Sequence, residues 1–213
     1  MAKRTSSRPT TTAQGVIPPD PAQNLLPCDG TVNYFGPIYG PDEAHNLLEA
    51  LLHGIPWQHD EAVMFGKRIV TARKVAWYGD AEFSYTYSGI TKRATPWTPA
   101  LKNLKATAEK WTGATYNSCL LNLYHHGGEG MAWHSDDEKM LAPNAPIASL
   151  SFGAERKFCF KHKQTGQTIS LILEAGSLLV MKGTTQKHWL HRLPPTTRVT
   201  TPRINLTFRT ITT

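Results

Sequence analysis

Two segments in the first half of the chain repeat apolar residues at the three- and four-residue spacing of an amphipathic helix. The first opens at Pro41 with two acids in its first turn, and Gly54 ends it. The second begins at Thr98-Pro99, where an N-cap residue precedes a proline at the first helical position, and Gly113 stops it. The expected buried faces are Leu47, Leu48, Leu51 and Leu52 in the first helix and Leu101, Leu104, Ala108 and Trp111 in the second.

Between and after these helices the apolar period changes to two, which is typical of β-strands. Three aromatic residues alternate with polar ones across residues 83–87, and residues 65–67 predict the tip of a hairpin or loop. Seven strands are expected after the second helix, at residues 117–124, 147–152, 157–161, 168–173, 177–182, 188–193 and 203–210. Many short strands after two helices predict a mainly β protein of the α+β class, an antiparallel sandwich or jelly roll with helices packed outside.

The composition fits one globular domain preceded by a tail. The chain has 213 residues, of which 40% are hydrophobic and 18% are charged. Residues 1–30 are rich in Thr, Ser and Pro and start with basic residues, so they are expected to form a flexible basic tail. We expect one integrated domain over residues 31–213. Its first part, residues 31–115, contains the two helices, and its second part, residues 116–213, contains most of the strands.

Net charge and cysteine content indicate the kind of partner and the cellular compartment of the protein. Lysines and arginines exceed acids by 23 to 16, which suits a polyanionic partner, nucleic acid first, although solubility alone explains the charge equally well. Cys119 and Cys159 lie in apolar strand-like segments and are expected to be buried thiols, which indicates a reducing compartment. No apolar run reaches the roughly 18 residues of a membrane span, and no secretory signal is present. We therefore expect a cytoplasmic protein without a membrane partner.

One short motif has the spacing of a metal-binding pair. On a strand, His134 and Asp136 would share a face while Asp137 points away, so a divalent metal would select Asp136. A solvated acidic loop is the alternative. For a third ligand the sequence offers His188 and His191, which are three apart and would face opposite sides of a strand, so only one can join the pair.

The last expected strand is unusual because one of its faces is polar and charged. Arg203, Asn205, Thr207 and Arg209 alternate there with Ile204, Leu206 and Phe208. Two guanidinium groups inside a fold need anions, which a bound dicarboxylic acid and a metal-ligating aspartate would supply. Asn122 and Tyr124 share a face of an earlier strand and could donate hydrogen bonds to the same carboxylate. For both strands, an ordinary edge strand with its polar face in water remains the alternative.

These motifs together resemble the iron(II)/2-oxoglutarate dioxygenases of the AlkB type. The likeness rests on His134-x-Asp136, a distal His191 and the Arg203-x-Asn205-x-x-x-Arg209 ending. It extends, in the correct order, to residues 78–80, 85–89, 122–124, 146–153 and 176–179. The resemblance implies a double-stranded β-helix, a jelly roll, as the catalytic core over residues 116–213. It also implies a nucleotide-recognition hairpin region within residues 31–115.

The same resemblance assigns roles to the residues that match the motifs. His134, Asp136 and His191 would bind Fe(II) and leave positions for 2-oxoglutarate and O₂. Arg203 would pair with the distal carboxylate of 2-oxoglutarate. Asn122, Tyr124 and Asn205 would assist Arg203, and Arg209 would hold Asp136 and the metal-proximal carboxylate.

The activity implied by the resemblance is oxidative removal of methyl groups from DNA bases. Such enzymes convert O₂ and 2-oxoglutarate to succinate and CO₂ while they hydroxylate an N-methyl group, which leaves as formaldehyde. N1-methyladenine and N3-methylcytosine are the expected substrates. Tyr87 and His134 would sandwich the cationic base, Tyr85 would lie beside it, and Glu138 would face its exocyclic amine.

The segment Met64-Phe65-Gly66 resembles the branch of the family that acts on duplex DNA, where an aromatic finger enters the base stack. Core packing of Phe65 is the alternative. That branch tends to carry a run of basic residues before the last strand, whereas Arg198 is the only basic residue between positions 194 and 202. The expected protein is a monomer that acts on duplex or single-stranded DNA, nucleoid-associated in a bacterium and nuclear in a eukaryote. Methylated RNA or a protein side chain as substrate, and a nucleic-acid-binding protein with a vestigial oxygenase site, are the competing hypotheses.

Overall fold

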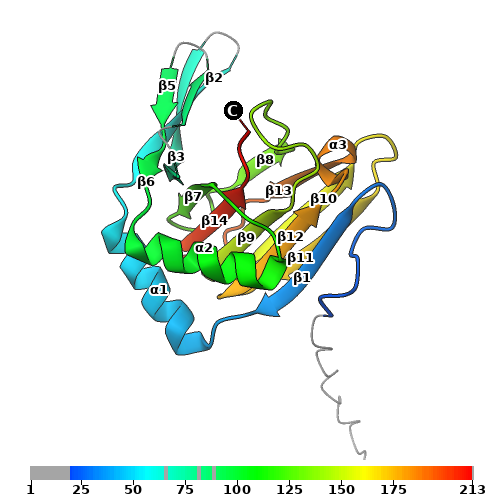
Figure 1. Cartoon of the computed structure of the whole chain (residues 1–213), viewed down its shortest axis with the longest axis horizontal. Helices are drawn as coiled ribbons and strands as arrows, with labels where there is room; N and C mark the ends of the chain where they lie inside the picture. Colours follow the sequence, from blue (N-terminus) through cyan, green and yellow to red (C-terminus); the bar gives the residue numbers. More distant parts are fainter. Residues whose placement is uncertain (1–19, 65–66, 81–82, 88–89, 213) are drawn as a thin grey trace, which may run out of the picture.

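Two β-sheets pack face to face, and two helices cover the outer face of the larger sheet (Figure 1). The computed structural model describes residues 20–64, 67–80, 83–87 and 90–212, without the side chains of 61–64, 67–69, 84–87 and 90–92. In the described residues no helix is long and apolar enough to span a membrane. The mainly β class with helices outside, expected from the strand count, is confirmed.

The larger sheet has the strand order β1-β12-β9-β14-β7-β3-β2, and the smaller sheet has the order β11-β10-β13-β8. The strands of the larger sheet are β1 (Thr31–Pro37), β2 (Gln58–Met64), β3 (Lys67–Gly79), β7 (Ser118–Tyr124), β9 (Ile147–Gly153), β12 (Ser177–Lys182) and β14 (Arg203–Arg209), and β6 (Thr95–Pro96) pairs with β3. The smaller sheet contains β8 (Met131–His134), β10 (Arg156–His162), β11 (Thr168–Leu173) and β13 (Trp189–Leu193). All seven strands expected after the second helix are present, with their boundaries shifted by at most one residue, as at His188.

The two predicted helices are α1 (Pro41–Gly54) and α2 (Pro99–Thr112), and both begin and end where their sequences indicate. The Thr98 hydroxyl caps α2 by accepting from the amide of Leu101, and Gly113 ends the helix at a φ of 66°. The prediction that Trp111 is buried is wrong, because its side chain is 46% exposed. In its last turn α2 reaches edge strand β1, where Phe35 packs edge-on against the Trp111 ring and leaves much of it open.

Strand β14 lies at the centre of the larger sheet, between β9 and β7, and both of its faces are covered. Its apolar residues, Ile204, Leu206 and Phe208, belong to the core formed with α1 and α2. Its polar residues point to the other side, into the space between the sheets, where Arg203 is 3% exposed. The alternation seen in the sequence therefore separates a core face from a site face.

A hairpin formed by β2 and β3 extends beyond the rest of the fold, beside a second hairpin of β4 (Ser84–Tyr87) and β5 (Ile90–Arg93) (Figure 1). The pairing of Met64 with Lys67 confirms a hairpin at this place. Phe65 and Gly66, which follow Met64 in the sequence, lie outside the described residues, and so do the side chains of Met64, Tyr85 and Tyr87.

Candidate metal and cosubstrate site

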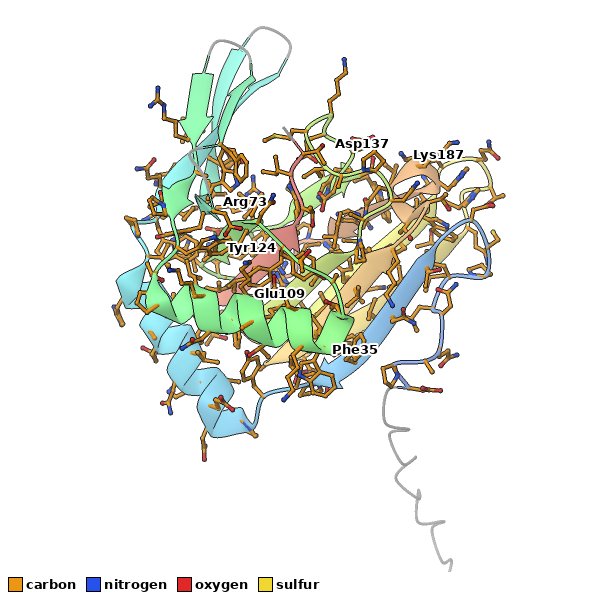
Figure 2. All side chains as sticks on the ribbon, viewed as in Figure 1. Phe35, Arg73, Glu109, Tyr124, Asp137 and Lys187 are labelled. Carbon is orange, nitrogen blue, oxygen red and sulfur yellow. The ribbon has the colours of Figure 1, made fainter. Side chains whose placement is uncertain are left out.

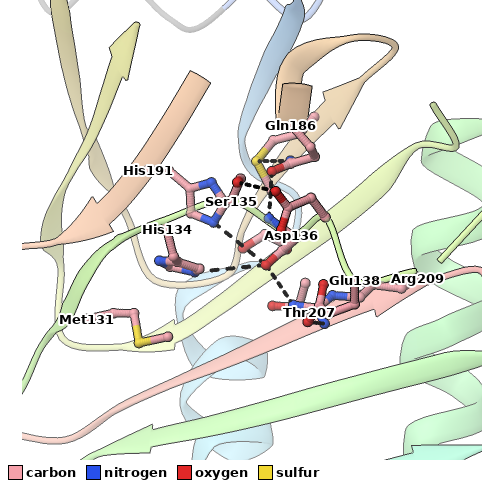
Figure 3. A network of polar contacts seen from close by, with 12 residues as sticks. Met131, His134, Ser135, Asp136, Glu138, Gln186, His191, Thr207 and Arg209 are labelled. Atoms are coloured by element: carbon pink, nitrogen blue, oxygen red, sulfur yellow. Dashed lines mark hydrogen bonds and ion pairs between the residues drawn. The ribbon is translucent and has the colours of Figure 1, made fainter. Parts of the chain in front are cut away.

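Two histidines and one aspartate converge between the sheets (Figure 3). His134, the last residue of β8, pairs in register with His191 of β13. The Nε2 atoms of His134 and His191 lie 3.8 and 3.9 Å from Oδ1 of Asp136, and all three ligand atoms lie within 4.8 Å of one another. This spacing suits a single divalent ion bound by all three.

His134 and Asp136 do not share a strand face, so this prediction is wrong. Strand β8 ends at His134, and Asp136 belongs to the loop that follows. The loop turns Asp136 inward, where it is buried, while the Asp137 side chain is 66% exposed and lies near Lys163 on the outer side. The loop geometry thus selects the same carboxylate for a different reason.

Contacts with its neighbours hold Asp136 in an ionised, inward orientation. The Oε1 atom of Gln186, in the short helix α3 (Thr185–His188), accepts a hydrogen bond from the Asp136 amide at 2.9 Å. The Nη2 atom of Arg209 lies 2.9 Å from Oδ1 of the Asp136 carboxylate. Burial alone would raise the pKa of Asp136, but the charges of Arg209 and the two histidines outweigh it and lower the pKa.

The histidines present the nitrogen lone pairs that a metal requires. The Nδ1–H of His134 donates to the carbonyl of Ala132 at 2.9 Å, which leaves its Nε2 free to bind. Burial lowers the pKa of His191 to about 4, so its imidazole is neutral at pH 7. The expectation that His188 lies on a strand is wrong, because it ends α3, and its ring stacks on His162 instead of joining the site.

The site face of β14 continues from the metal ligands to Arg203, whose guanidinium lies 5.6 Å from the ring centroid of Tyr124. Its Nη2 donates to the hydroxyl of Ser151 at 2.9 Å, and its Nε has no partner among the described residues. Burial lowers the pKa of Arg203 to about 10. A buried guanidinium without an ion pair in the described part of the chain is a binding place for an anion.

The two asparagines of this face differ in what they offer to a ligand. Asn205 donates from its amide nitrogen to the Ser149 hydroxyl and the Leu150 carbonyl, so its donors are engaged within the sheet. Asn122 accepts from Nη1 of Arg73 at 2.7 Å, an orientation that directs its own amide nitrogen away from Arg73.

Arg73 is a site residue that sequence reasoning did not find. It is buried on β3 (Figure 2) and forms an ion pair with Asp60 of β2. Its contact with Asn122 depends on the pairing of β3 with β7, which no local sequence signal reveals.

Glu138 lies at the Arg209 end of β14, which is the opposite end of the strand from Arg203. Its Oε1 is 3.3 Å from Nη1 of Arg209, and its Oε2 is buried without a partner among the described residues. A cavity of about 430 Å³ lies here, and Asp136, Glu138, Gln186 and Arg209 are among the residues that line it. Arg209 therefore joins a metal-ligand carboxylate to a carboxylate beside the cavity.

The donor set fits Fe(II) and a dicarboxylic 2-oxo acid. Two imidazoles and one carboxylate on neighbouring elements leave coordination positions open, and the anion-binding Arg203 lies on the same face as Arg209. The 2OG-Fe(II) oxygenase superfamily matches residues 31–209 of the chain. The chain therefore belongs to this superfamily of iron(II)- and 2-oxoglutarate-dependent oxygenases and, by its relatives, to the AlkB family.

The relatives are proteins of the ALKBH2 and ALKBH3 kind. The chain is 41% identical over 197 residues to DNA oxidative demethylase ALKBH2 of Mus musculus, covering 87% of this chain and 80% of the relative. It is 41% identical over 179 residues to alpha-ketoglutarate-dependent dioxygenase alkB homolog 3 of Homo sapiens, covering 79% of this chain and 62% of the relative. The solved structure of OsALKBH1 has the same fold, with a TM-score of 0.56, 15% identity and coverage of 84% of this chain and 97% of that one.

Proposed function

We propose that this protein repairs alkylated DNA by Fe(II)- and 2-oxoglutarate-dependent oxidative demethylation, with N1-methyladenine and N3-methylcytosine as substrates. The observation that carries the proposal is the convergence of His134, Asp136 and His191 on the face that also holds the buried Arg203. The similarity to proteins named DNA oxidative demethylase supports the choice of substrate.

The chain's own residues hold the reactants in place. His134, Asp136 and His191 would hold Fe(II), which supplies the means to activate O₂ against the N-methyl group. Arg203, with Tyr124 and the amide nitrogen of Asn122, would bind the distal carboxylate of 2-oxoglutarate. A fixed set of donors orients the oxo acid without reorganisation at the moment of reaction.

The substrate base would bind on the Glu138 side of the metal ligands. The free Oε2 of Glu138 is a suitable acceptor for an exocyclic amine, and its charge favours a cationic methylated base. The ring of His134, which is partly exposed, would form one side of the base sandwich and Tyr87 the other, with Tyr85 nearby. Because the base must leave its stack to reach this place, Phe65 at the hairpin turn, with Met64 and Gly66, would fill the gap.

A nucleic-acid substrate is favoured over a protein side chain by the net charge of +7 and by the relatives. A DNA substrate places the enzyme in the nucleoid of a bacterium or the nucleus of a eukaryote. Methylated RNA offers the same base chemistry, and it is the alternative that the experiment below includes.

The test is mass spectrometry of oligonucleotides with one N1-methyladenine, as duplex DNA, single-stranded DNA and RNA, after incubation with protein, Fe(II), ascorbate and 2-oxoglutarate. The proposal expects loss of one methyl group from DNA only when both Fe(II) and 2-oxoglutarate are present, and none with Asp136→Ala. Faster demethylation of the RNA than of either DNA oligonucleotide would indicate that methylated RNA is the substrate. Oxidation of 2-oxoglutarate without demethylation would exclude these bases, and no turnover would indicate a vestigial site.

A further inference from the structure

A second buried arginine lies at the Arg203 end of the site face. Arg156, the first residue of β10, is 2% exposed. The turn from β9 to β10 brings it to the start of β14, since Gly153 pairs with Arg203 and the amide of Ala154 donates to the carbonyl of Pro202 at 2.9 Å. Burial lowers the pKa of both guanidinium groups, and the positive charge of Arg156 lowers the pKa of Arg203 further.

The donors of this arginine pair are only partly used. Nη2 of Arg156 donates to the backbone carbonyls of Glu129 and Pro194, each at 2.9 Å, while its Nε and Nη1 have no partner in the described residues. Nε of Arg203 also lacks a partner there. Three nitrogen atoms of the two buried cations are thus unsatisfied, which is unfavourable unless an anion binds.

No carboxylate within the described part of the chain forms an ion pair with either arginine. The acid that acts on Arg156 from nearby is Glu129, but its carboxylate is engaged by the backbone amide and the ring of His125. The described residues therefore provide no anionic partner for Arg156 or Arg203, and three of their donor nitrogens stay available to a bound carboxylate.

We propose that Arg156 binds the distal carboxylate of the cosubstrate together with Arg203, and that this pair selects dicarboxylic over monocarboxylic 2-oxo acids. The proposal rests on the use of 2-oxoglutarate in the proposed function. A carboxylate has about four lone-pair directions, enough to accept from two guanidinium groups at once. A 2-oxo acid that ends in a methyl group would leave both cations unsatisfied, so the site would discriminate against it.

A purely structural role for Arg156 makes a different prediction. Its Nη2 ties two backbone segments together, and loss of that link would lower stability and weaken every ligand alike. The measurement must therefore compare two ligands that differ only at the distal end. The pair 2-oxoglutarate and 2-oxopentanoate has the same five-carbon chain and the same metal-binding end, with and without the second carboxylate.

The experiment is isothermal titration calorimetry of Mn(II)-loaded protein with each oxo acid, with 2-oxopentanoate also measured by competition. The variants are Arg156→Met, Arg156→Lys and, as control, Arg198→Met, an exposed arginine in the segment 194–202. Arg156→Met should weaken 2-oxoglutarate at least about tenfold, as expected for a lost charge-assisted contact. It should leave 2-oxopentanoate within about twofold, because that ligand never makes this contact. Arg156→Lys should recover part of the loss, and Arg198→Met should change neither affinity.

Two results would overturn the inference. Unchanged 2-oxoglutarate affinity in Arg156→Met would show that the guanidinium does not reach the carboxylate. Equal weakening of the binding of both oxo acids, together with a lowered melting temperature, would show that Arg156 only links the backbone segments at Glu129 and Pro194. Neither readout requires DNA, so a failure here is distinguishable from a failure of the proposed demethylase activity.

Discussion

Arg209 Nη2 lies 2.9 Å from Oδ1 of Asp136, the same oxygen atom that faces the two histidines. Arg209 ends β14 of the larger sheet, whereas His134 and His191 belong to the smaller sheet. The carboxylate is therefore held from one sheet and completes a ligand set that comes from the other. The site exists only when the two sheets are packed together.

Removing the ligand carboxylate should remove the metal. We expect Asp136→Ala to lose bound Fe(II) and all turnover, because a two-histidine set cannot retain the ion against solvent. Metal content of the anaerobically loaded protein measures this. Asp137→Ala and His188→Ala are the matched controls, since the first side chain is exposed and the second stacks on His162. An iron-free His188→Ala protein would contradict the assignment.

Gln186 should influence metal affinity without touching the metal. Its Oε1 accepts from the Asp136 amide and so fixes the backbone of the ligand loop. We expect Gln186→Ala to weaken Fe(II) roughly 10- to 100-fold, the usual effect of losing a group that orients a metal ligand. Competition with a chelator under anaerobic conditions measures the affinity. Lys187→Ala, at an exposed position of the same helix, should bind as the unaltered protein does, and the idea fails if both variants weaken binding equally.

Arg203 should determine the affinity for 2-oxoglutarate. Loss of a charge-assisted contact costs about 1.5–3 kcal/mol, or roughly 10- to 150-fold in affinity. Arg203→Ala should accordingly raise the KM for 2-oxoglutarate by that factor while changing the KM for DNA little. Steady-state kinetics with each substrate varied in turn checks this, and an unchanged KM for 2-oxoglutarate would remove Arg203 from the site.

Phe65 should matter for duplex DNA more than for single strands. A finger offsets unstacking by a few kcal/mol per base step, and this benefit arises only where a flipped base leaves stacked neighbours behind. We expect Phe65→Ala to slow repair of a lesion in a duplex far more than in a single strand, with an unchanged melting temperature. Core packing predicts instead a loss of about 3–5 kcal/mol of stability and equal effects on both substrates. A parallel loss with a lowered melting temperature would refute the finger.

Local sequence patterns were sufficient for helices α1 and α2, for the seven strands expected after them and for the two faces of β14. Helix α2 carries its start and stop signals at Thr98 and Gly113, and capping acts over only a few residues. The alternation from Arg203 to Arg209 predicted a charged inner face because strand side chains alternate irrespective of what surrounds them. The motif spacing predicted the pair of His134 and Asp136, although the geometric reason given for Asp136 was wrong. It left His188 and His191 as alternatives for the third ligand, and only the family resemblance selected His191.

The tertiary structure alone decided which distant groups meet. The contact of Arg73 with Asn122 needs β3 beside β7, and the approach of Arg156 to Arg203 needs the β9–β10 turn to meet the start of β14. Trp111 satisfied the helical pattern but lies partly in solvent, because burial depends on what packs against the last turn. Such contacts join residues 47 or more positions apart, and no periodicity within one segment can encode a neighbour that another segment supplies.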